Sequence, residues 1–193
     1  MKALPRSFYR RDTVDVARDL LGKVLAHGPA AGIIVETEAY LGGDDLASHS
    51  AVGITDRTRV IFGPPGHAYV YLSYGMHECV NIVAEPEGKA GAVLIRALEP
   101  IEGLAIMRSR RPKARTDRDL TSGPGKLTRA LDITRAQNGV DLTRGDVTRG
   151  DLIVRPPGIA RAFEIDVSPR IGITKCADLP LRFTVKGNPF ISR

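Results

Sequence analysis

The chain lacks much of what several familiar kinds of protein are built from. Its 193 residues include two cysteines, no tryptophan, five phenylalanines and five tyrosines. Cys79 and Cys176 are too few for a disulfide framework, which fits a reducing compartment. No apolar run approaches the roughly 18 residues that a membrane-spanning helix needs. The charged start "MKALPRSFYRRD" lacks the apolar stretch of a signal peptide, so a cytoplasmic protein without a membrane partner is predicted.

Positive charge is what the sequence has in excess. Lysine and arginine number 28 against 22 aspartates and glutamates, which gives a formal net charge of +6 and a pI of about 9.6. A basic protein of this size suits a polyanionic partner such as nucleic acid, but the same excess can serve solubility alone. With 42% hydrophobic residues and no linker, residues 1–193 are predicted to form one globular domain.

Periodicity and turn residues predict an α+β domain built on an antiparallel or mixed sheet. A helix in the segment 10–23 is expected to begin after Asp12 as its cap and to end at Gly22. Strands are predicted at 23–27, 32–40, 67–73, 77–85, 90–100, 151–155, 160–167 and 180–187, and further helices at 101–111 and 122–133. Pro100 is expected to end its strand, and loops are expected at 41–58 and 111–119.

Charged side chains interrupt two of these strands. Alternation along 32–40 places Glu36 and Glu38 on one face together with Ile34. A solvated strand face is the simple interpretation, and a carboxylate kept in a basic cleft as a general base or metal ligand is the alternative. Arg96 lies in an otherwise apolar strand and needs an anionic partner, either nearby Glu99 or a pocket shared with Glu38; spacing does not choose.

Three of the five tyrosines fall in the short stretch "YVYLSYGM" at 69–76. A three-residue turn at 74–76, with Gly75 in a left-handed conformation, would pair Ser73 with His77 across a hairpin. That register places a set of side chains on one face that a two-residue turn would separate, namely Tyr69, Tyr71, His77, Cys79 and Asn81. Tyr74 then lies at the tip, as a wedge between stacked bases unless all three tyrosines simply pack in the core.

Other motifs carry weaker signals. His77 and Cys79 have no second pair of ligands, so no metal site is predicted. The segment "SGPGKLT" does not satisfy the phosphate-loop pattern and is better explained as a helix start, with Ser122 as cap. Free N–H groups there, at Ser122, Gly123 and Lys126, could hold one phosphate. The basic run 108–115 is either a solvated loop or a phosphate contact.

Seven segments together resemble the alkyladenine (3-methyladenine) DNA glycosylase family. They are "VARDLLG" (16–22), "IVETEAYLG" (34–42), "ASHS" (47–50), "FGPPGHAYVYLSYGMHECVNIV" (62–83), "VLIRALEP" (93–100), "SGPGKL" (122–127) and "LRFTVKGNPFIS" (181–192). They follow the family's order and cover most of the chain. The resemblance implies a curved, mainly antiparallel sheet flanked by helices, with a protruding β-hairpin.

The resemblance also implies roles for single residues. Glu38 would be the general base that activates water, and Arg96 would help to hold that water with a backbone carbonyl near Val185. Tyr74 would enter the DNA in place of the extruded nucleotide. The residues implied for the base pocket are Tyr40, His49 and Tyr71 for stacking, the backbone at Ala47 and His49 for reading the base edge, Asn81 for excluding normal guanine, and Leu94 as lining.

The implied activity is excision of alkylated purines from double-stranded DNA by hydrolysis, which leaves an abasic site without strand cleavage. No lysine in these motifs is placed for a Schiff base, and no cofactor is expected. A monomer is expected, nucleoid-associated if the source is bacterial. The chain departs from the family pattern at Asp56, where proline is usual, and at His77. A non-catalytic nucleic-acid-binding module and a nucleoside hydrolase remain the alternatives.

Overall fold

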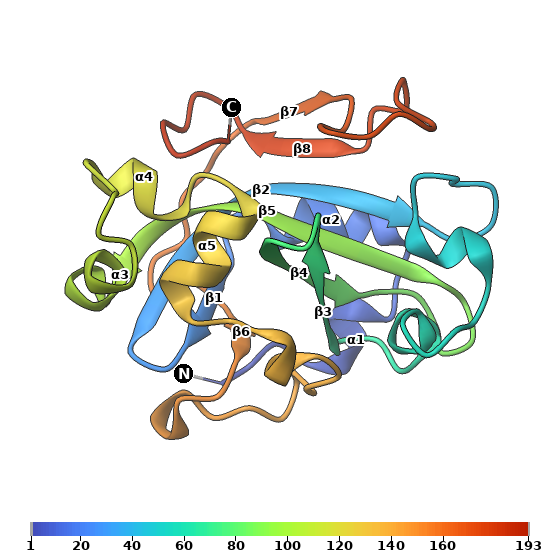
Figure 1. The fold of residues 1–193 in the computed structure, drawn as a ribbon. Coiled ribbons are helices and arrows are strands. Elements are labelled where there is room, and N and C mark those ends of the chain that lie inside the picture. The colour runs from blue at the N-terminus through green and yellow to red at the C-terminus, as the bar shows by residue number, and fades with distance from the viewer. Residues whose placement is uncertain (1, 193) are drawn as a thin grey trace.

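A computed structural model describes residues 2–192 as eight antiparallel strands in one sheet, with short helices around it (Figure 1). The strands are β1 (Val24–His27), β2 (Ala30–Leu41), β3 (Ala68–Ser73), β4 (His77–Val83), β5 (Gly91–Glu102), β6 (Ile153–Arg155), β7 (Ile165–Ser168) and β8 (Arg182–Val185). Their order is β3-β4-β5-β2-β1-β6, with β8 also paired to β2 and β7 to β8. The predicted α+β class with an antiparallel sheet is confirmed.

The helices are short and lie mainly at two places in the chain. They are α1 (Arg6–Tyr9), α2 (Thr13–Leu20), α3 (Leu104–Arg110), α4 (Asp117–Thr121) and α5 (Pro124–Leu131). Four 3-10 turns add to them, at His49–Val52, Arg59–Phe62, Arg135–Gln137 and Val147–Arg149. Within residues 2–192, no helix has the length and apolar character that crossing a bilayer requires.

Helix α2 forms as its sequence predicts. The Asp12 carboxylate accepts hydrogen bonds from the backbone N–H groups of Val14 and Asp15, so it caps the first turn. Val16 and Leu20 are fully buried and belong to the main hydrophobic core together with side chains of the central strands, α4 and α5. This face of the sheet is therefore covered by helices. Thr37 of β2 is buried on it, where its hydroxyl donates to the Ala17 carbonyl of α2, and the two glutamates of β2 lie on the other face.

Two bulges set which side chains emerge there. The pairing of β2 with β5 runs from Ile34–Leu98 to Glu36–Ala97 and then to Thr37–Ile95, so each strand carries one extra residue, Val35 and Arg96. Ile34 is therefore in the core, whereas Glu36 and Glu38 lie on the opposite face. The prediction that Ile34 shares a face with the two glutamates is wrong, because simple alternation fails at a bulge.

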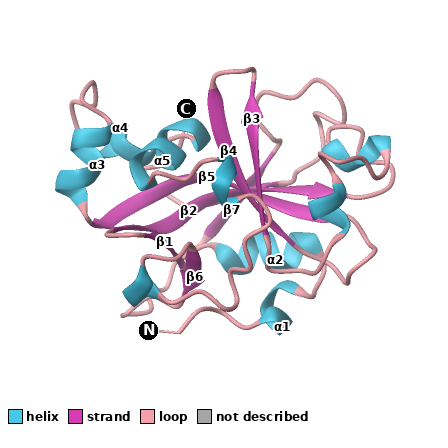
Figure 2. Cartoon of the chain, turned by 60° about the horizontal axis from the view of Figure 1, so that its bottom comes forward, coloured by secondary structure: helices cyan, strands magenta, loops and turns pink. Residues whose placement is uncertain are grey.

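The hairpin of β3 and β4 has the register that the three-residue turn predicts. Ser73 pairs with His77, and Figure 2 shows the hairpin standing out from the body of the sheet. Gly75 has φ +69° as expected, and Tyr74 is also left-handed, with φ +49°. The Met76 N–H closes the turn on the Ser73 carbonyl at 3.0 Å. This protrusion carries Tyr74 away from the core.

Three further predictions about the chain between β5 and α5 are wrong. Strand β5 continues past Pro100 to Glu102, because a register shift opposite Gly32 tolerates the missing N–H. The expected loop 111–119 contains the start of α4. Ser122 does not cap the following helix: Gly123 is the cap residue of α5, and no side chain accepts from its first N–H groups.

Candidate active site

A cluster of two carboxylates and one guanidinium lies on the polar face of β2 and β5. Glu36 and Glu38 are fully buried, and Arg96 is 8% exposed. The Arg96 Nε lies 3.1 Å from Glu36 Oε1, and its Nη1 lies 3.2 Å from Glu38 Oε2. Of the two partners considered for Arg96, the structure selects the pocket of Glu38, because the bulge turns Arg96 toward β2.

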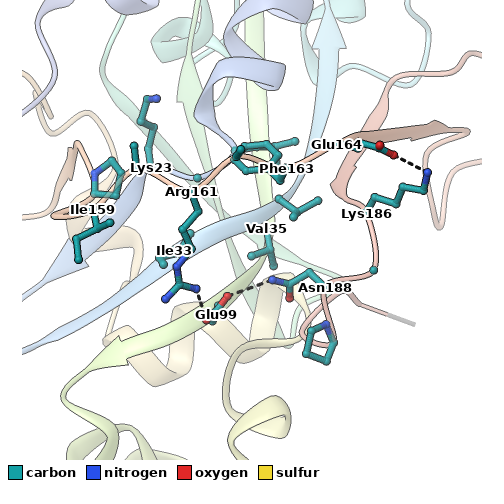
Figure 3. A pocket seen from close by; sticks show the side chains of 18 residues that line it. Lys23, Ile33, Val35, Glu99, Ile159, Arg161, Phe163, Glu164, Lys186 and Asn188 are labelled. Carbon is teal, nitrogen blue, oxygen red and sulfur yellow. Dashed lines mark hydrogen bonds and ion pairs between the residues drawn. The ribbon is translucent and has the colours of Figure 1, made fainter.

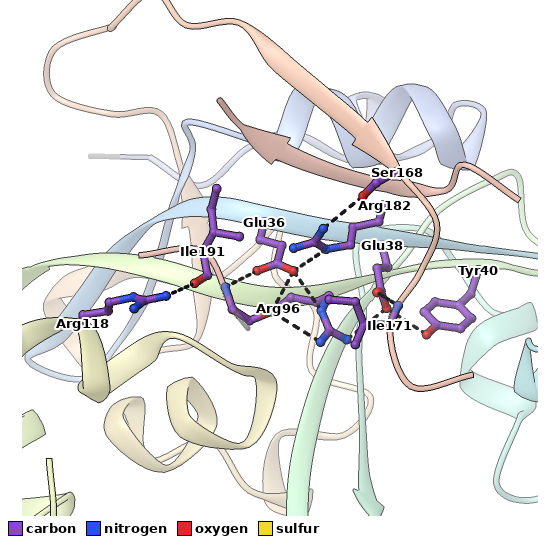
Figure 4. Close-up of polar contacts among 10 residues, drawn as sticks. Glu36, Glu38, Tyr40, Arg96, Arg118, Ser168, Ile171, Arg182 and Ile191 are labelled. Atoms are coloured by element: carbon purple, nitrogen blue, oxygen red, sulfur yellow. Dashed lines mark hydrogen bonds and ion pairs between the residues drawn. The ribbon is translucent and has the colours of Figure 1, made fainter. Parts of the chain in front are cut away.

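Three donors fix the Glu38 carboxylate (Figure 4). Its Oε1 accepts the backbone N–H of Ile171 at 2.7 Å, and its Oε2 accepts the Tyr40 hydroxyl at 3.0 Å as well as Arg96. Burial, and after it the Glu38 charge, raise the pKa of the Tyr40 hydroxyl, which therefore stays protonated and donates. These contacts hold the Glu38 carboxyl group in one orientation.

Glu36 organises the surroundings of this pair. It accepts hydrogen bonds from Arg96, from Arg182 Nε at 2.7 Å, and from the Ser192 N–H and hydroxyl at 2.7 and 2.8 Å. One buried carboxylate thus ties β2, β5, β8 and the C-terminal segment together. The sequence placed Glu36 beside Glu38 but gave no sign of this role, since its partners lie up to 156 residues away.

A cavity of about 530 Å³ opens beside the cluster, and we call it the aromatic cavity. Its lining includes every residue that the resemblance implied for the base pocket, namely Tyr40, Ala47, His49, Tyr71, Asn81 and Leu94, together with Arg96 and Tyr74. Glu38 itself does not line the cavity. It is buried directly behind three residues that do line it, Tyr40, Arg96 and Ile171. The carboxylate is therefore at the back of the wall.

Strand register explains why residues so far apart meet. Tyr69 is opposite Asn81, Asn81 is opposite Leu94, and Leu94 is opposite Glu38. Directly opposite residues of antiparallel strands lie on the same face. One row of side chains therefore crosses β3, β4, β5 and β2 from the aromatic residues to the carboxylate.

Aromatic rings form one wall of the cavity. Tyr69 and Tyr71 stack with ring centroids 5.4 Å apart, and His49 meets Tyr71 edge to face at 4.6 Å. The His49 Nδ1 lies 3.0 Å from the Tyr69 hydroxyl. Burial, and then the nearby Arg57 charge, lower the pKa of His49 below its usual 6.5, so the imidazole is neutral at neutral pH.

Arg57 was not predicted as part of this site. Its guanidinium carbon lies 5.4 Å from the Tyr71 ring centroid, and its Nη2 lies 3.4 Å from His49 Nε2. The side chain belongs to an exposed loop. It occupies a face of the ring that a stacked ligand would use, and nothing in the local sequence pattern indicated this.

Tyr74 lies at the mouth of the aromatic cavity, on the hairpin tip. Its side chain is 85% exposed, which excludes a core-packing role. A left-handed backbone costs a non-glycine residue roughly 1–2 kcal/mol, and Tyr74 adopts one with no burial to offset it. An exposed, strained aromatic at this position favours a role in contact with a partner.

Val185 is not brought to the site. It lines a separate cavity of about 630 Å³ between β2 and the C-terminal strands (Figure 3). Its carbonyl accepts the N–H of Asn188 at 3.1 Å. In the same cavity Glu99 pairs with Arg161 and Asn188, and so is not a partner of Arg96. The backbone group that contacts Glu38 belongs to Ile171, in a loop 133 residues away that no sequence motif marked.

The predicted phosphate contacts gather in a third cavity of about 590 Å³, lined in part by Ser122, Gly123 and Lys126. The Lys126 ammonium donates to the Ser122 hydroxyl at 3.4 Å. The prediction of free N–H groups at these residues is wrong, because the Ser122 N–H donates to the Arg118 carbonyl, the Gly123 N–H to the Thr121 carbonyl and the Lys126 N–H to the Gly123 carbonyl. Across residues 2–192, no three histidine, cysteine, aspartate or glutamate side chains gather where they could hold a metal ion.

A buried carboxylate–arginine pair behind an aromatic cavity, on a basic α+β domain with an exposed tyrosine at its mouth, has the layout of an enzyme that handles an aromatic base. A family model described as methylpurine-DNA glycosylase (MPG) matches residues 7–189. The chain therefore belongs to the methylpurine-DNA glycosylase family, a family of DNA-repair hydrolases, as the motifs predicted.

Relatives are similar over nearly their whole length. A protein of Methanoculleus marisnigri named "Putative 3-methyladenine DNA glycosylase" is 53% identical over 198 residues, which cover 98% of this chain and 98% of that protein. Proteins with the same name from Methanocella arvoryzae and Rhodopseudomonas palustris are 50% and 52% identical. The match with the Methanocella arvoryzae protein covers 100% of this chain and 97% of that protein. The match with the Rhodopseudomonas palustris protein covers 98% of this chain and 88% of that protein.

Proposed function

We propose that this protein is a monofunctional DNA glycosylase for alkylated purines of the 3-methyladenine and 7-methylguanine type. The observation that carries the proposal is the Glu38–Arg96 pair behind the aromatic cavity, with Tyr74 exposed at its mouth. The enzyme would act on double-stranded DNA in base excision repair. One copy of the chain supplies every side chain that the mechanism uses, and we propose that it acts as a monomer.

Extrusion of the damaged nucleotide is the first step. Flipping a nucleotide out of a duplex costs a few kcal/mol for lost stacking and pairing. An aromatic side chain inserted into the stack replaces part of that loss. Tyr74 is suited to this, because its exposed ring lies beside the cavity that would receive the base.

The base would stack on Tyr71 and contact His49, after displacing the Arg57 guanidinium. A purine alkylated at N3 or N7 is cationic and is attracted to electron-rich aromatic faces. The lowered pKa of His49 suits such a base, because a neutral imidazole does not repel it. Asn81, whose amide donates to the Tyr69 carbonyl at 3.1 Å, would narrow the floor against the amino group of normal guanine. Leu94 and the backbone at Ala47 would complete the pocket.

The chemistry then needs a positioned water. As the water oxygen attacks C1′, Glu38 takes its proton, and the electron pair of the breaking C1′–N bond leaves with the purine and neutralises it. Little acid catalysis is needed for so good a leaving group. Glu38 Oε2 already accepts from Tyr40 and Arg96, whereas Oε1 accepts from the Ile171 N–H alone, so the water would donate to the second acceptor position of Oε1. No lysine lines the described part of the aromatic cavity, which supports hydrolysis rather than strand cleavage.

The test is release of 7-methylguanine and 3-methyladenine from duplex DNA by wild type and Glu38→Gln. The proposal expects release to fall at least 10²-fold in the variant, with binding to a duplex carrying a tetrahydrofuran abasic analogue retained. A nucleoside hydrolase would instead cleave free 7-methylguanosine and ignore the duplex. Lesion binding without release by either protein would favour a binding module and overturn the proposal.

A further inference from the structure

The third cavity, which we call the basic cavity, collects positive charge. Five cationic side chains and one carboxylate line it: Arg96, Arg111, Arg118, Lys126, Arg129 and Asp119. It lies between α4, α5 and the turn end of the β3–β4 hairpin, where His77 also lines it. It shares Arg96 and Pro124 with the aromatic cavity, so the two cavities adjoin.

Most of this charge is not neutralised. Arg96 is paired with Glu36 and Glu38, but none of the other four cations has a carboxylate within 4.0 Å in the described chain. Asp119 is committed elsewhere, because its Oδ2 accepts the N–H groups of Arg115 and Thr116 and the Thr116 hydroxyl at the start of α4. Arg118, Lys126 and Arg129 donate to backbone carbonyls or a hydroxyl, which are neutral acceptors and leave the positive charge uncompensated.

Because these cations are held close together, they lower the free energy of unfolding of the protein when no DNA is bound. Burial, and after it the Arg129 charge, lower the pKa of Arg111, which reflects a cation held in an unfavourable place. The Nε atoms of Arg111 and Arg118 are buried and have no acceptor in the described chain. Buried donors are almost always satisfied in native proteins, so these two nitrogens add to the cost of holding the cations in the cavity wall.

The β3–β4 hairpin packs directly against α5, a helix that lines the basic cavity. A Cβ on Gly125 would lie 2.8 Å from the Cβ of His77, so only glycine lets the turn end of the hairpin pack against the start of α5. The N-terminus of α5 faces the same cavity and adds its positive dipole end. A strand engaged by Tyr74 at the hairpin tip would therefore pass close to these cations.

We propose that the basic cavity binds a backbone phosphate of the DNA strand that carries the flipped nucleotide, through Arg111, Lys126 and Arg129. This inference rests on the proposed function and deepens it. Phosphodiester is the anion that a DNA substrate supplies there, because the adjoining cavity would hold the sugar and base of the same strand. Phosphate contacts fix register along the strand without reading sequence.

Arg118 links the basic cavity to the C-terminal segment of the chain. Its Nη2 donates to the Ile191 carbonyl at 3.0 Å, and the next residue, Ser192, binds Glu36. A continuous series of hydrogen bonds thus joins the basic cavity to the carboxylate that holds Arg96 (Figure 4). Changing Arg118 would also disturb the C-terminal segment, so it is not a clean test.

Arg111→Gln and Arg129→Gln test the proposal, with Arg149→Gln as the matched control. Arg149 is exposed and lines none of the three cavities. Binding is measured to a duplex with a tetrahydrofuran abasic analogue, in which single phosphates around the analogue are replaced by neutral methylphosphonates. We expect each cavity variant to weaken binding about tenfold, while Arg149→Gln binds as wild type does. The melting temperature should stay unchanged or rise for Arg111→Gln. It should fall slightly for Arg129→Gln, because the Arg129 Nε donates to the Arg110 carbonyl at 3.0 Å.

The decisive result is non-additivity at one phosphate. One methylphosphonate position should weaken wild type about tenfold and have little further effect on Arg111→Gln or Arg129→Gln. If both variants respond like wild type at every position, or bind as tightly as Arg149→Gln, the inference is wrong. These binding measurements do not need catalysis. Non-additivity without base release would overturn the proposed activity and support the phosphate site. Base release without non-additivity would support the proposed activity and overturn the phosphate site.

Discussion

The Arg96 guanidinium lies 3.2 Å from the Glu38 carboxylate, although 58 residues separate the two in the chain. Both are buried, so each depends on the other to offset the cost of leaving water. A bulge at Arg96 produces the contact, because it turns the side chain out of the regular alternation of β5. The pair combines a fixed negative charge with a donor beside a cavity, which suits the stabilisation of a positively charged sugar in a transition state.

Glu36 is expected to act as a positioning residue. Glu36→Gln removes the charge that Arg96 and Arg182 share, and breaking a buried ion pair costs about 3–5 kcal/mol. Because Arg96 would lose its orientation, single-turnover base release should fall on the order of 10²-fold, with affinity for the lesion little changed. Urea unfolding and single-turnover kinetics measure the two effects.

Glu99→Gln is the matched control for that prediction. It makes the same chemical change at a carboxylate whose ionic partner, Arg161, is 69% exposed. Exposed pairs contribute about 0–1 kcal/mol, so stability and base release should both stay close to wild type. Equal effects of the two substitutions would show that Glu36 has no special link to Arg96.

Tyr74 is expected to lower the stability of the hairpin turn, because of its left-handed backbone, while it increases base release from duplex DNA. Asparagine tolerates a positive φ better than tyrosine does, so Tyr74→Asn should leave the free energy of unfolding unchanged or raise it by up to about 1 kcal/mol. Base release from duplex DNA should fall, and release from single-stranded DNA should fall less. Tyr74→Phe keeps the ring and should retain activity; if it is as impaired as the asparagine variant, insertion of the ring is not its role.

The charge of His49 should determine how tightly cationic bases bind at low pH. Its lowered pKa keeps the ring neutral at neutral pH, and protonation requires a lower pH than for an ordinary histidine. The protonated ring, beside Arg57, would then repel a cationic purine. Binding of a 7-methylguanine duplex by Glu38→Gln should therefore weaken between pH 7.5 and 5, relative to a duplex carrying neutral hypoxanthine.

Replacing His49 separates this effect from titration of the other three histidines. In the background of Glu38→Gln, His49→Asn should make the ratio of the two affinities independent of pH. A ratio that still falls toward pH 5 in that double variant would assign the effect to another group.

Arg57 is expected to compete with the base for the Tyr71 ring. Arg57→Ala should expose that face of the ring and lower the KM for duplex DNA carrying 7-methylguanine, because the base no longer has to displace a cation. The same substitution should raise the pKa of His49, which stays below 6.5 because burial, the larger cause of its depression, remains. Titration of the His49 resonances by NMR measures that shift; an unchanged pKa would contradict the placement of Arg57.

Local features of this fold were predictable from local sequence. Asp12 caps α2 because its side chain reaches the next two N–H groups, and the hairpin parity follows from Gly75 and the two-residue period of a strand. The exposure of Tyr74 follows from the same register. These features depend on interactions within a few residues, which spacing describes fully.

The sequence by itself determined the family, the hairpin with Tyr74 at its tip and the residue types that line the aromatic cavity. Tertiary structure alone decided that Ile34 enters the main hydrophobic core, whereas Glu36 and Glu38 are buried on the opposite face of the sheet. It also decided that Ile171 rather than Val185 contacts Glu38. It also gathered Arg111 and Arg129 around one cavity. The physical reason is that bulges and loop paths are set by how the whole chain packs, so contacts across more than 100 residues have no signature in local spacing.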